Sequence, residues 1–575
     1  MKFLRILVYC SLLFFTARLF ALDREAFTFT HYDLQVKIDG PLQGFIASGK
    51  VTLRNDSEGP QHLAVLQISS TLSWKSIRID GKPVQYLTQP FTSDADHTGK
   101  VSEAVVTLPH EVPPQKTVEL EIAYQGTIVA DSTRLTRIGV PAEIAARNDW
   151  DQISAQFTAV RGVGYVAWYP VALDALNLSD GPQTFTVINS WKARHELSSM
   201  RVNLCTEVDE PSPPTLIMNA PVGGTRGGSV SAGAQGTTTA CREFTFSRFG
   251  LSVPTFAMGN YVTLDRPAIT VYYLGEHKVP ATDYALAAES VLPFSMQWFG
   301  KPKEKIVVVE VGQANATPFE SGPMLFTPIA SVDQKRLQLT LIHQLVHATF
   351  ESPRPWIYEG LAHFAQALER EQQEGRKAGV AYMDAFRPAL VEAEKPAQGG
   401  QTGQPLVTAT DEVFYRTKAM FVWWMLRDMV GDDTLQRALQ NYRAEEDAEP
   451  SYVQRLLAKS SRRDLEWFFD AWVYRDRGLP DFRVVSSYPR QMLNGGFLVT
   501  VTVENLGNAA AEVPVLVQAG AGENSQRVMV AAKGKGVARI QMPLAPEEAI
   551  VNDGSVPESD PANNSLKIAP AEKNP

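Results

Sequence analysis

The sequence predicts a multidomain α+β protein with a β-sandwich-like N-terminal region, a mixed helix-and-strand middle region and a small C-terminal β-sandwich. A chain of 575 residues is too long for one hydrophobic core, which favours several domains. Along the chain the hydrophobic pattern changes from the alternation of strands to the spacing of helices and back again. We expect the three regions to span residues 22–265, 266–480 and 481–575, after a short leading segment.

That leading segment, residues 1–21, has the order of charge, apolar run and small residues that is typical of a secretory signal. We therefore expect export with removal of residues 1–21, which makes the mature protein periplasmic or secreted, with no stable membrane span. An N-terminal membrane anchor is the alternative, but the apolar run from Ile6 to Phe15 is short for a span.

Composition narrows the partners and the redox state. The formal net charge is -9 and no basic run occurs, which argues against nucleic acid as a partner. Removal of the signal would leave Cys205 and Cys241 as the cysteines of the mature chain. Two cysteines that flank one polar loop in an oxidising compartment favour a disulfide, and two separate buried thiols are the alternative.

The N-terminal region is expected to be β throughout, because its segments alternate apolar and polar residues. Examples are Tyr32–Ile38, Val118–Tyr124 and Thr184–Ile188. The stretch Gly223–Thr239 is rich in Gly, Ser, Thr and Ala, which predicts a flexible loop between strands.

The middle and C-terminal regions differ in their periodicity. In the middle region we expect strands at Thr270–Leu274 and Ile306–Val311, and helices at Asp283–Trp298, Asp333–Phe350, Ile357–Gln372 and Tyr415–Val430. In the C-terminal region we expect strands at Phe497–Val503, Val513–Val517, Val528–Val530 and Ala538–Met542, followed by a mobile tail from Asp553.

The chemistry is concentrated between Leu341 and Glu371. His343 and His347 are four residues apart on a predicted helix, so both imidazoles lie on one face and form a pair of ligands for zinc. The chain breaks at two prolines and begins a second helix, in which Glu359 can supply an oxygen ligand. Three protein ligands with an open fourth position are the catalytic arrangement of Zn²⁺. The alternative is two surface histidines that are hydrogen-bonded to neighbouring side chains.

This segment resembles the gluzincin family of membrane alanyl aminopeptidases and leukotriene-hydrolase-type enzymes, where HExxH is followed by a helix that starts as NEGFA. The resemblance implies a thermolysin-like middle domain, bound zinc and a peptide or protein substrate. It covers about residues 27–485, with the C-terminal sandwich matching the shorter, three-domain members. Further matching segments are GYVAWYPV (Gly164–Val171), VPTFAMGNYV (Val253–Val262), YRTKAMFVWWML (Tyr415–Leu426) and LEWFFDAWVYRDRGLPDFRV (Leu465–Val484).

The resemblance also implies a role for Tyr415, which corresponds to the tyrosine that donates a hydrogen bond to the oxyanion of the tetrahedral intermediate. A neutral phenol suits that task because it donates without being consumed. Lys418 and Ala419 follow it as in the family's Tyr-x-Lys-Gly-Ala helix. The alternative is an aromatic side chain that packs at the start of a helix.

The sequence departs from the family at the position of the general base. Gln344 stands where the family has the glutamate that takes a proton from the attacking water. A carboxamide does not accept a proton near neutral pH, although it can form hydrogen bonds with the water. Loss of a general base costs about 10²–10⁴ in rate, so we expect weakened or lost hydrolysis.

The family's exopeptidase motif, Gly-Ala-Met-Glu-Asn, reads GPMLF here, with Gly322 and Met324 as the matching substrate-binding residues. Leu325 replaces the glutamate that holds the free amine of the substrate, which puts aminopeptidase specificity in doubt. Glu320 is near enough in the sequence to take over that role.

The ligand spacing also departs from the family. Eleven residues separate His347 from Glu359, a gap shorter than the family's by roughly two helical turns. His363, one turn after Glu359, is then a reserve ligand, and packing on its helix is the interpretation that we prefer.

Two functions remain open at the level of sequence. The first is an exported, aminopeptidase-like zinc metallopeptidase with weakened hydrolysis. The second is a catalytically inactive peptide-binding or scaffold module, a pseudoenzyme that keeps the fold. A structural zinc site is less favoured, because such sites usually have four protein ligands, often including cysteine.

Overall fold

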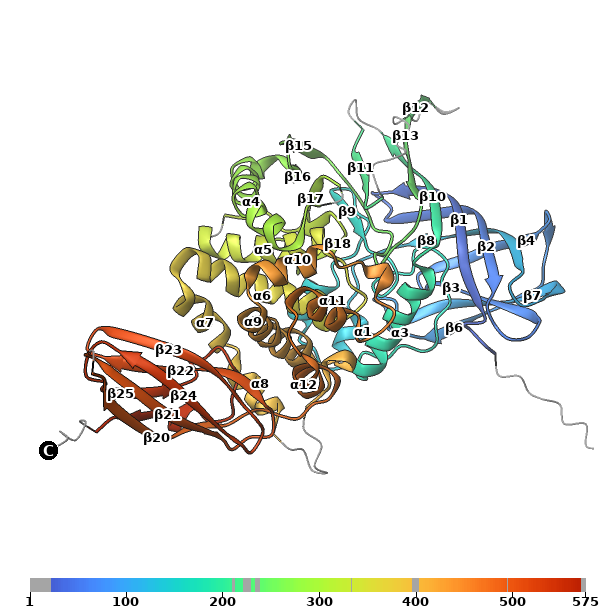
Figure 1. Ribbon diagram of the computed structural model, residues 1–575. Helices are drawn as coiled ribbons and strands as arrows, with labels where there is room; N and C mark the ends of the chain where they lie inside the picture. Colours follow the sequence, from blue (N-terminus) through green and yellow to red (C-terminus); the bar gives the residue numbers. More distant parts are fainter. Residues whose placement is uncertain are drawn as a thin grey trace, which may run out of the picture.

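The computed structural model describes most of the chain. The described residues are 22–208, 213–220, 229–232, 238–302, 304–331, 333–395, 403–493 and 495–569. The expected signal, residues 1–21, lies outside them, as do residues 223–228 and 233–237 of the predicted loop. The loop prediction is wrong for Ser229–Ala232, which form a strand paired with β13. The architecture is the predicted multidomain α+β: helices α4–α12 lie between the N-terminal sheets and the C-terminal sandwich (Figure 1).

The N-terminal region is built on two antiparallel-rich sheets that share one core. An eight-stranded sheet has the order β12-β13-β10-β1-β2-β8-β4-β5, and a three-stranded sheet has the order β3-β7-β6. The predicted strand at Tyr32–Ile38 lies in β1, whose alternate residues are buried, as the period of two requires. A further sheet, β11-β14-β9, faces the middle region. The elements are β1 Phe27–Asp39, β2 Gly44–Asn55, β3 Gln61–Ser69, β4 Leu72–Ile79, β5 Lys82–Pro83, β6 Tyr86–Thr92, β7 Lys100–Val112, β8 Thr117–Thr127, α1 Thr133–Thr136, α2 Ala142–Asn148, β9 Phe157–Val160, α3 Gly181–His195, β10 Ser199–Val208, β11 Thr215–Met218, β12 Ser229–Ala232, β13 Thr238–Phe246 and β14 Phe256–Gly259.

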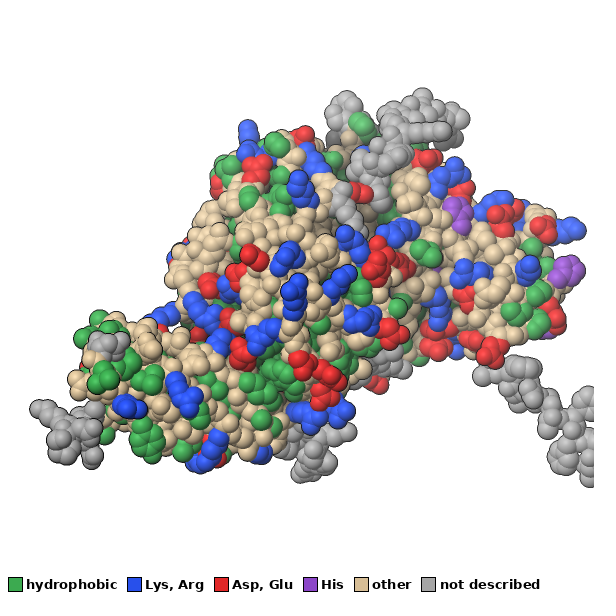
Figure 2. Space-filling model, viewed as in Figure 1, with side chains coloured by type: hydrophobic (Ala, Val, Ile, Leu, Met, Phe, Trp, Pro, Cys, Tyr) green, Lys and Arg blue, Asp and Glu red, His purple; other side chains and the backbone are tan. Residues whose placement is uncertain are grey.

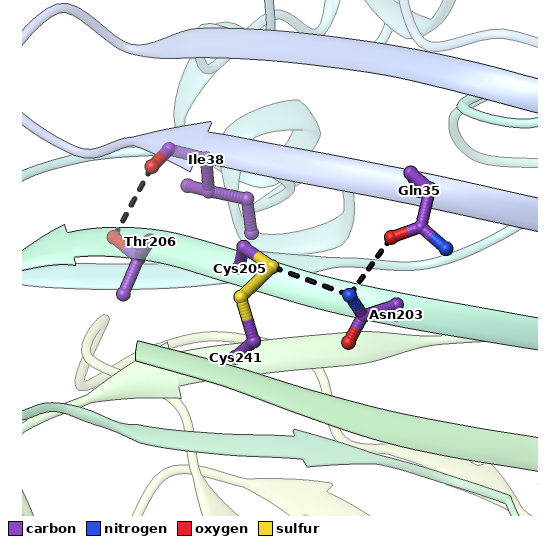
Figure 3. Close-up of a disulfide and its surroundings, with 6 residues drawn as sticks. All are labelled: Gln35, Ile38, Asn203, Cys205, Thr206 and Cys241. Carbon is purple, nitrogen blue, oxygen red and sulfur yellow. Dashed lines mark hydrogen bonds between the residues drawn. A yellow bond between two sulfur atoms is a disulfide. The ribbon is translucent and has the colours of Figure 1, made fainter. Parts of the chain in front are cut away.

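A disulfide joins Cys205 on β10 to Cys241 on β13 (Figure 3). The two cysteines are directly opposite each other on antiparallel strands. Beside them, Asn203 Nδ2 donates to Gln35 Oε1 of β1 at 2.8 Å. The bond spans a sequence separation of 36 residues. Closing a loop of that length restricts the unfolded chain and stabilises the fold by about 3–4 kcal/mol.

The strand predicted at Thr184–Ile188 is wrong, because this segment lies in the helix α3. Five alternating residues fit either period, and the longer window decides. Trp191 and His195 continue one helical face, where their rings stack 4.5 Å apart in the N-terminal core. His195 Nε2 accepts a hydrogen bond from the backbone N–H of Phe29 at 3.3 Å, which ties α3 to β1. Packing against the sheet therefore selects the helix.

The middle region has a mixed five-stranded sheet under a group of helices. Its order is β15-β16-β17-β19-β18, with β16, β17 and β19 parallel and β18 antiparallel at the edge. The chain joins this sheet at Tyr261, a few residues before the expected boundary at Arg266. The elements are β15 Tyr261–Asp265, β16 Ile269–Leu274, η1 Gly275–His277, α4 Lys278–Phe299, β17 Ile306–Glu310, β18 Phe319–Ser321, β19 Met324–Thr327, α5 Gln334–Thr349, α6 Pro355–Glu374, α7 Arg376–Asp384, α8 Arg387–Ala393, η2 Leu406–Thr408, η3 Val413–Lys418, α9 Ala419–Val430, α10 Asp432–Gln440, η4 Ala444–Glu446, α11 Tyr452–Ser461, α12 Glu466–Phe469 and η5 Asp470–Tyr474.

The C-terminal region is a small sandwich of two sheets, β20-β21-β24 and β23-β22-β25-β26. The mobile tail predicted from Asp553 is wrong for the described residues. Val556 is fully buried, and Glu558 Oε2 accepts a hydrogen bond from the backbone N–H of Phe482 at 3.2 Å. The tail thus completes the core of the sandwich, which polar and Pro-rich composition did not indicate. The elements are β20 Phe482–Gln491, β21 Phe497–Asn505, β22 Ala511–Ala519, β23 Gly522–Val530, β24 Lys535–Met542, β25 Glu548–Val551, η6 Pro561–Asn563 and β26 Ser565–Lys567.

Charged side chains of both signs are mixed over the helical region on the face that Figure 2 shows. Exposed ion pairs such as Lys335–Glu374 and Arg370–Glu374, both at 2.8 Å, contribute at most about 1 kcal/mol each. Among the described residues, no helix combines the length and the apolar character that crossing a membrane requires.

Candidate metal centre

Two consecutive helices bring the predicted ligands together. Helix α5 begins after Asp333, whose side chain accepts a hydrogen bond from the backbone N–H of Arg336 at 3.1 Å and so caps the helix. Helix α6 begins with Pro355, which suits the first turn because its missing N–H is not needed there. Since α6 packs against α5, Glu359 faces the histidine pair.

The three donor atoms converge as a metal site requires. His343 Nε2 lies 3.2 Å from His347 Nε2, and the oxygens of Glu359 lie 3.7 Å from His347 Nε2 and 4.0 Å from His343 Nε2. Zinc bonds of about 2.0–2.2 Å in a tetrahedron separate neighbouring ligand atoms by about 3.4 Å. The present spacing fits this geometry after a shift of Glu359 by less than about 1 Å. Among the described residues this is the one group of three or more His, Cys, Asp or Glu side chains that converge in this way.

Both imidazoles are held in the neutral form that binds metal. Burial lowers the pKa of His347 to about 3, and the neighbouring His363 and Arg416 add to the effect. Burial and the proximity of His347 lower the pKa of His343 well below its ordinary value. Because only a neutral ring offers a lone pair, this histidine pair needs no deprotonation before it binds a cation.

Gln344 is buried on α5 between the two histidines. Its Oε1 accepts a hydrogen bond of 2.6 Å from the hydroxyl of Tyr284 on α4. Burial raises the pKa of Tyr284, so this phenol stays protonated and donates. The buried Nε2 of Gln344 makes no hydrogen bond among the described residues. Gln344 therefore presents a donor on its other side, where a glutamate would present an acceptor.

Arg416 is a site residue that the sequence analysis missed. Its Nε donates to Glu359 Oε2 at 3.1 Å, and its Nη1 donates to Glu412 Oε2 at 2.8 Å. It lies on η3, a π-helix with a wider turn than an α-helix. The sequence carried no signal for it, because Arg416 stands at the unspecified position of the family's Tyr-x-Lys-Gly-Ala pattern and Ala419 keeps that pattern's spacing from Tyr415.

Tyr415 is buried beside this arginine, whose guanidinium carbon lies 5.6 Å from the centre of the phenol ring. Burial raises the pKa of Tyr415 to about 12, and the charge of Glu359 contributes to the increase. The phenol is therefore a neutral donor close to the metal group. That position is compatible with the role that the resemblance implies.

The segment Glu320–Leu325 forms a hairpin at the edge of the middle sheet. Gly322 lies in its turn with a φ of 58°, in the left-handed region that favours glycine. Met324 packs in a core cluster with Trp150 and Phe326, away from the metal group. Leu325 is fully buried beneath α4 and α5, so no polar group takes the place of the missing glutamate at that position.

Glu320 is the residue of this hairpin that reaches the site. The pKa of Glu320 is raised to about 7, first by burial and then by the charge of Glu359, while Gln344 and Arg416 oppose the increase. Glu320 is therefore near enough to Glu359 and Gln344 for both to affect its pKa.

Helix α3 brings a second unexpected cation toward the site. Burial lowers the pKa of Lys192 on α3, and the charge of Glu359 opposes that shift. No sequence signal pointed to Lys192, which lies on α3 after the segment Thr184–Ile188 that alternated like a strand.

His363 occupies the next turn of α6 after Glu359. Its ring centre lies 5.1 Å from that of His343, and its buried Nε2 makes no hydrogen bond among the described residues. Burial lowers its pKa to about 4. His363 is not part of the converging group, which favours the packing interpretation.

Comparison with known proteins identifies the fold. No family model matches the sequence, and no curated protein matches it. Among solved structures, the M1 zinc metallopeptidase from Deinococcus radiodurans aligns over 78% of this chain and 94% of its own, with a TM-score of 0.52 and 16% identity. Legionella pneumophila aminopeptidase A in complex with aspartic acid aligns over 93% of this chain and 59% of its own, with a TM-score of 0.63 and 11% identity.

A mutant of the Deinococcus radiodurans metallopeptidase, solved with a Tyr-Ser-Ala substrate, also aligns over 78% of this chain and 94% of its own, with a TM-score of 0.50 and 16% identity. At these identities the likeness concerns the fold. The chain thus has the fold of M1 zinc metallopeptidases.

Proposed function

We propose that this chain is an exported zinc-dependent metallopeptidase that acts on peptides, with hydrolysis weakened by Gln344. The observation that carries the proposal is the convergence of His343, His347 and Glu359 from two consecutive helices, with both imidazoles neutral. A peptide substrate is supported by the solved neighbour that holds Tyr-Ser-Ala in the same fold. Export is supported by the leading sequence pattern and by the disulfide, which an oxidising compartment maintains.

The chemistry divides between the ion and the chain. When bound, zinc would act as a Lewis acid that polarises the substrate carbonyl and the attacking water. His343, His347 and Glu359 would hold it, and Tyr415 would donate to the oxyanion that forms as the water adds. Gln344 can hold the attacking water by a hydrogen bond from its Nε2, but it does not accept the water's proton, because a carboxamide is not basic near neutral pH. Its Oε1 already accepts a hydrogen bond from Tyr284.

The amine-binding function of the related exopeptidases is the part least supported here. Leu325 is buried and apolar at the position of the family's glutamate. We therefore propose little preference for a free N-terminus, and Gly322 and Met324 as residues that shape the hairpin. Glu320 is the acidic group that could still meet a substrate amine.

One observation favours a second function, a peptide-binding module without catalysis. Arg416 donates to Glu359 at 3.1 Å, so a protein cation already pairs with one ligand oxygen. If that ion pair outcompetes zinc, the residues around His343 and His347 keep their arrangement, but the site holds no metal. Peptide binding would then be insensitive to a chelator.

Metal analysis of the purified mature protein, beside peptide hydrolysis with and without a chelator, separates the two functions. We expect about one zinc per chain and slow hydrolysis that the chelator abolishes. Metal-free protein that binds peptide equally well with and without chelator would overturn the proposal in favour of the binding module.

A further inference from the structure

We propose that Glu320, on the edge strand β18, accepts the proton of the attacking water, and that the Nε2 group of Gln344, unpartnered among the described residues, is the donor that turns to this carboxylate when substrate binds. The inference rests on the proposed peptidase function and assigns the base that Gln344 does not supply. It gives Glu320 a catalytic role in place of the amine-binding role that its nearness to GPMLF suggested.

The backbone places Glu320 on the correct face of the sheet. Glu320 is directly opposite Leu325 in the antiparallel pair of β18 and β19. Directly opposite residues point to the same face, and Leu325 is buried against α5. Glu320 therefore also faces α5, which packs against β18. Because β18 is the outermost strand, Glu320 is only half-buried, and a substrate can reach it.

The amide of Gln344 is oriented to hold a carboxylate. Tyr284 donates to Gln344 Oε1 at 2.6 Å, which leaves the Nε2 group as the free donor end of that side chain. Burial and the charge of Glu359 raise the pKa of Glu320 to about 7, and Gln344 opposes that shift. A carboxyl group with a pKa near the working pH is partly ionised and is a stronger base than an ordinary carboxylate, so it suits general-base catalysis.

The N-terminal region fixes the strand that carries Glu320. The ring of Phe319, the preceding residue, meets the ring of Tyr165 edge-on at 5.3 Å. Arg161 stacks on Tyr165 at 3.7 Å and pairs with the buried Asp151 at 2.6 Å. An edge strand is usually mobile, but here a fully buried ion pair anchors it beside the metal group.

The step that this assigns is complete in atoms and charges. The water oxygen bonds to the peptide carbonyl carbon while one water proton passes to the Glu320 carboxylate. As the carbon–nitrogen bond breaks, that proton passes to the departing amine nitrogen. The second water proton stays on the new carboxyl group and then passes to the amine or to solvent. At neutral pH the products are a carboxylate and an ammonium group, and Glu320 returns to its ionised form.

Moving the carboxylate between two positions tests the assignment. We compare Glu320→Gln, Gln344→Glu and the double variant Glu320→Gln/Gln344→Glu by steady-state peptide hydrolysis and zinc content. We expect Glu320→Gln to lower kcat about 10²-fold or more at unchanged zinc content, since a general base contributes about 10²–10⁴. The double variant restores a carboxylate at position 344, so we expect its kcat to be at least about tenfold higher than that of Glu320→Gln.

Glu392→Gln is the control, because Glu392 is an exposed carboxylate on α8 that pairs with Lys395 at 2.5 Å. It removes the same charge, so its activity should stay within about threefold of the unchanged chain. The single variant Gln344→Glu places two carboxylates side by side, and we expect a gain below about tenfold because one of them is already the base.

Three results contradict the inference in different ways. If Glu320→Gln keeps full zinc and its activity stays within threefold of the unchanged chain, Glu320 is not the base, and the proposed peptidase function is unaffected. A gain above about 10²-fold in Gln344→Glu would show that the site had no base. If Glu320→Gln fails to fold, the activity of Gln344→Glu decides: a gain below about tenfold supports Glu320 as the base, and a gain above about 10²-fold contradicts it. Absence of chelator-sensitive hydrolysis in the unchanged chain would refute the proposed function, and with it this inference.

Discussion

Two arginine–carboxylate pairs lie beside aromatic rings in this protein, and they differ in how completely they are satisfied. Arg161 and Asp151 are 3% and 0% exposed, and their closest atoms are 2.6 Å apart. Asp151 also accepts from the backbone N–H of Arg161 at 2.6 Å. Arg416 and Glu359 are 39% and 19% exposed, and their closest atoms are 3.1 Å apart.

The difference separates a structural pair from an exchangeable one. Asp151 has all its strong acceptor positions filled by one arginine, within a closed cluster of aromatic rings. Glu359 has its other oxygen 3.7 Å from a neutral imidazole, where a cation can bridge the two. The first pair holds the fold, and the second occupies a site that zinc can take over.

Removal of a ligand should give the largest effect. We expect His347→Ala to lose its zinc and to hydrolyse peptides no faster than chelated protein, because two ligands hold the ion poorly. Metal analysis and an activity assay measure this. His363→Ala is the control, and it should keep a full equivalent of zinc. A full equivalent in His347→Ala would show that the ligands are misassigned.

Breaking the buried pair should cost stability rather than metal. Asp151→Ala leaves the Arg161 guanidinium buried without a partner, which costs about 3–5 kcal/mol in the free energy of unfolding. Urea denaturation measures the loss. Asp33→Ala is the control, because Asp33 pairs with Arg201 at an exposed position and should cost less than about 1 kcal/mol. A loss below about 1 kcal/mol for Asp151→Ala would make the two pairs equivalent.

The same pair should give the fold its sensitivity to acid. Burial alone would raise the pKa of Asp151, but the charge and hydrogen bonds of Arg161 lower it below 3.8. The unfolded chain therefore takes up this proton first. The contribution of Asp151 is present above pH 3.8 and is lost as the pH falls through the folded value.

Asp151→Asn should accordingly flatten the decrease of unfolding free energy at acid pH, by about 1.4 kcal/mol for each unit of the shift. Chemical denaturation at several pH values between neutrality and the acid range measures it. An unchanged slope in the variant would mean that other carboxylates determine the acid sensitivity.

The exchangeable pair should give the smallest effect. Arg416→Gln removes the competitor for Glu359, so zinc affinity should rise by up to about fivefold, as expected for an exposed pair worth at most about 1 kcal/mol. Competition with a coloured chelator measures the affinity. Arg370→Gln, which breaks an exposed pair on the outer part of α6, should leave it unchanged. A lower affinity in Arg416→Gln would show that the arginine supports the ligand instead of competing for it.

The metal group could be predicted from the sequence because its information is local. His343 and His347 are one helical turn apart, and two prolines mark where the second helix begins before Glu359. The alternation of strands and the density of apolar residues in α9 likewise fixed the multidomain α+β architecture. Each of these signals lies within one window of the chain.

The residues around the metal group depend on long-range packing, which such windows do not contain. Lys192 is near enough to Glu359 for that charge to affect its pKa, because the chain after the alternating segment Thr184–Ile188 continues as the helix α3. Glu320 faces α5 because of the register of β18 with β19. Arg416 approaches Glu359 through a π-helix, which the spacing of the motif did not indicate. The tail after Asp553 orders because the sandwich needs its last strand.

The most direct test of the exchangeable pair is a crystal of the mature protein grown with zinc and measured on both sides of the zinc absorption edge. We predict one anomalous peak within about 2.2 Å of His343 Nε2, His347 Nε2 and a Glu359 oxygen, with the Arg416 guanidinium moved away from Glu359. No peak at that position at full zinc exposure, with Arg416 still bonded to Glu359, would contradict the account.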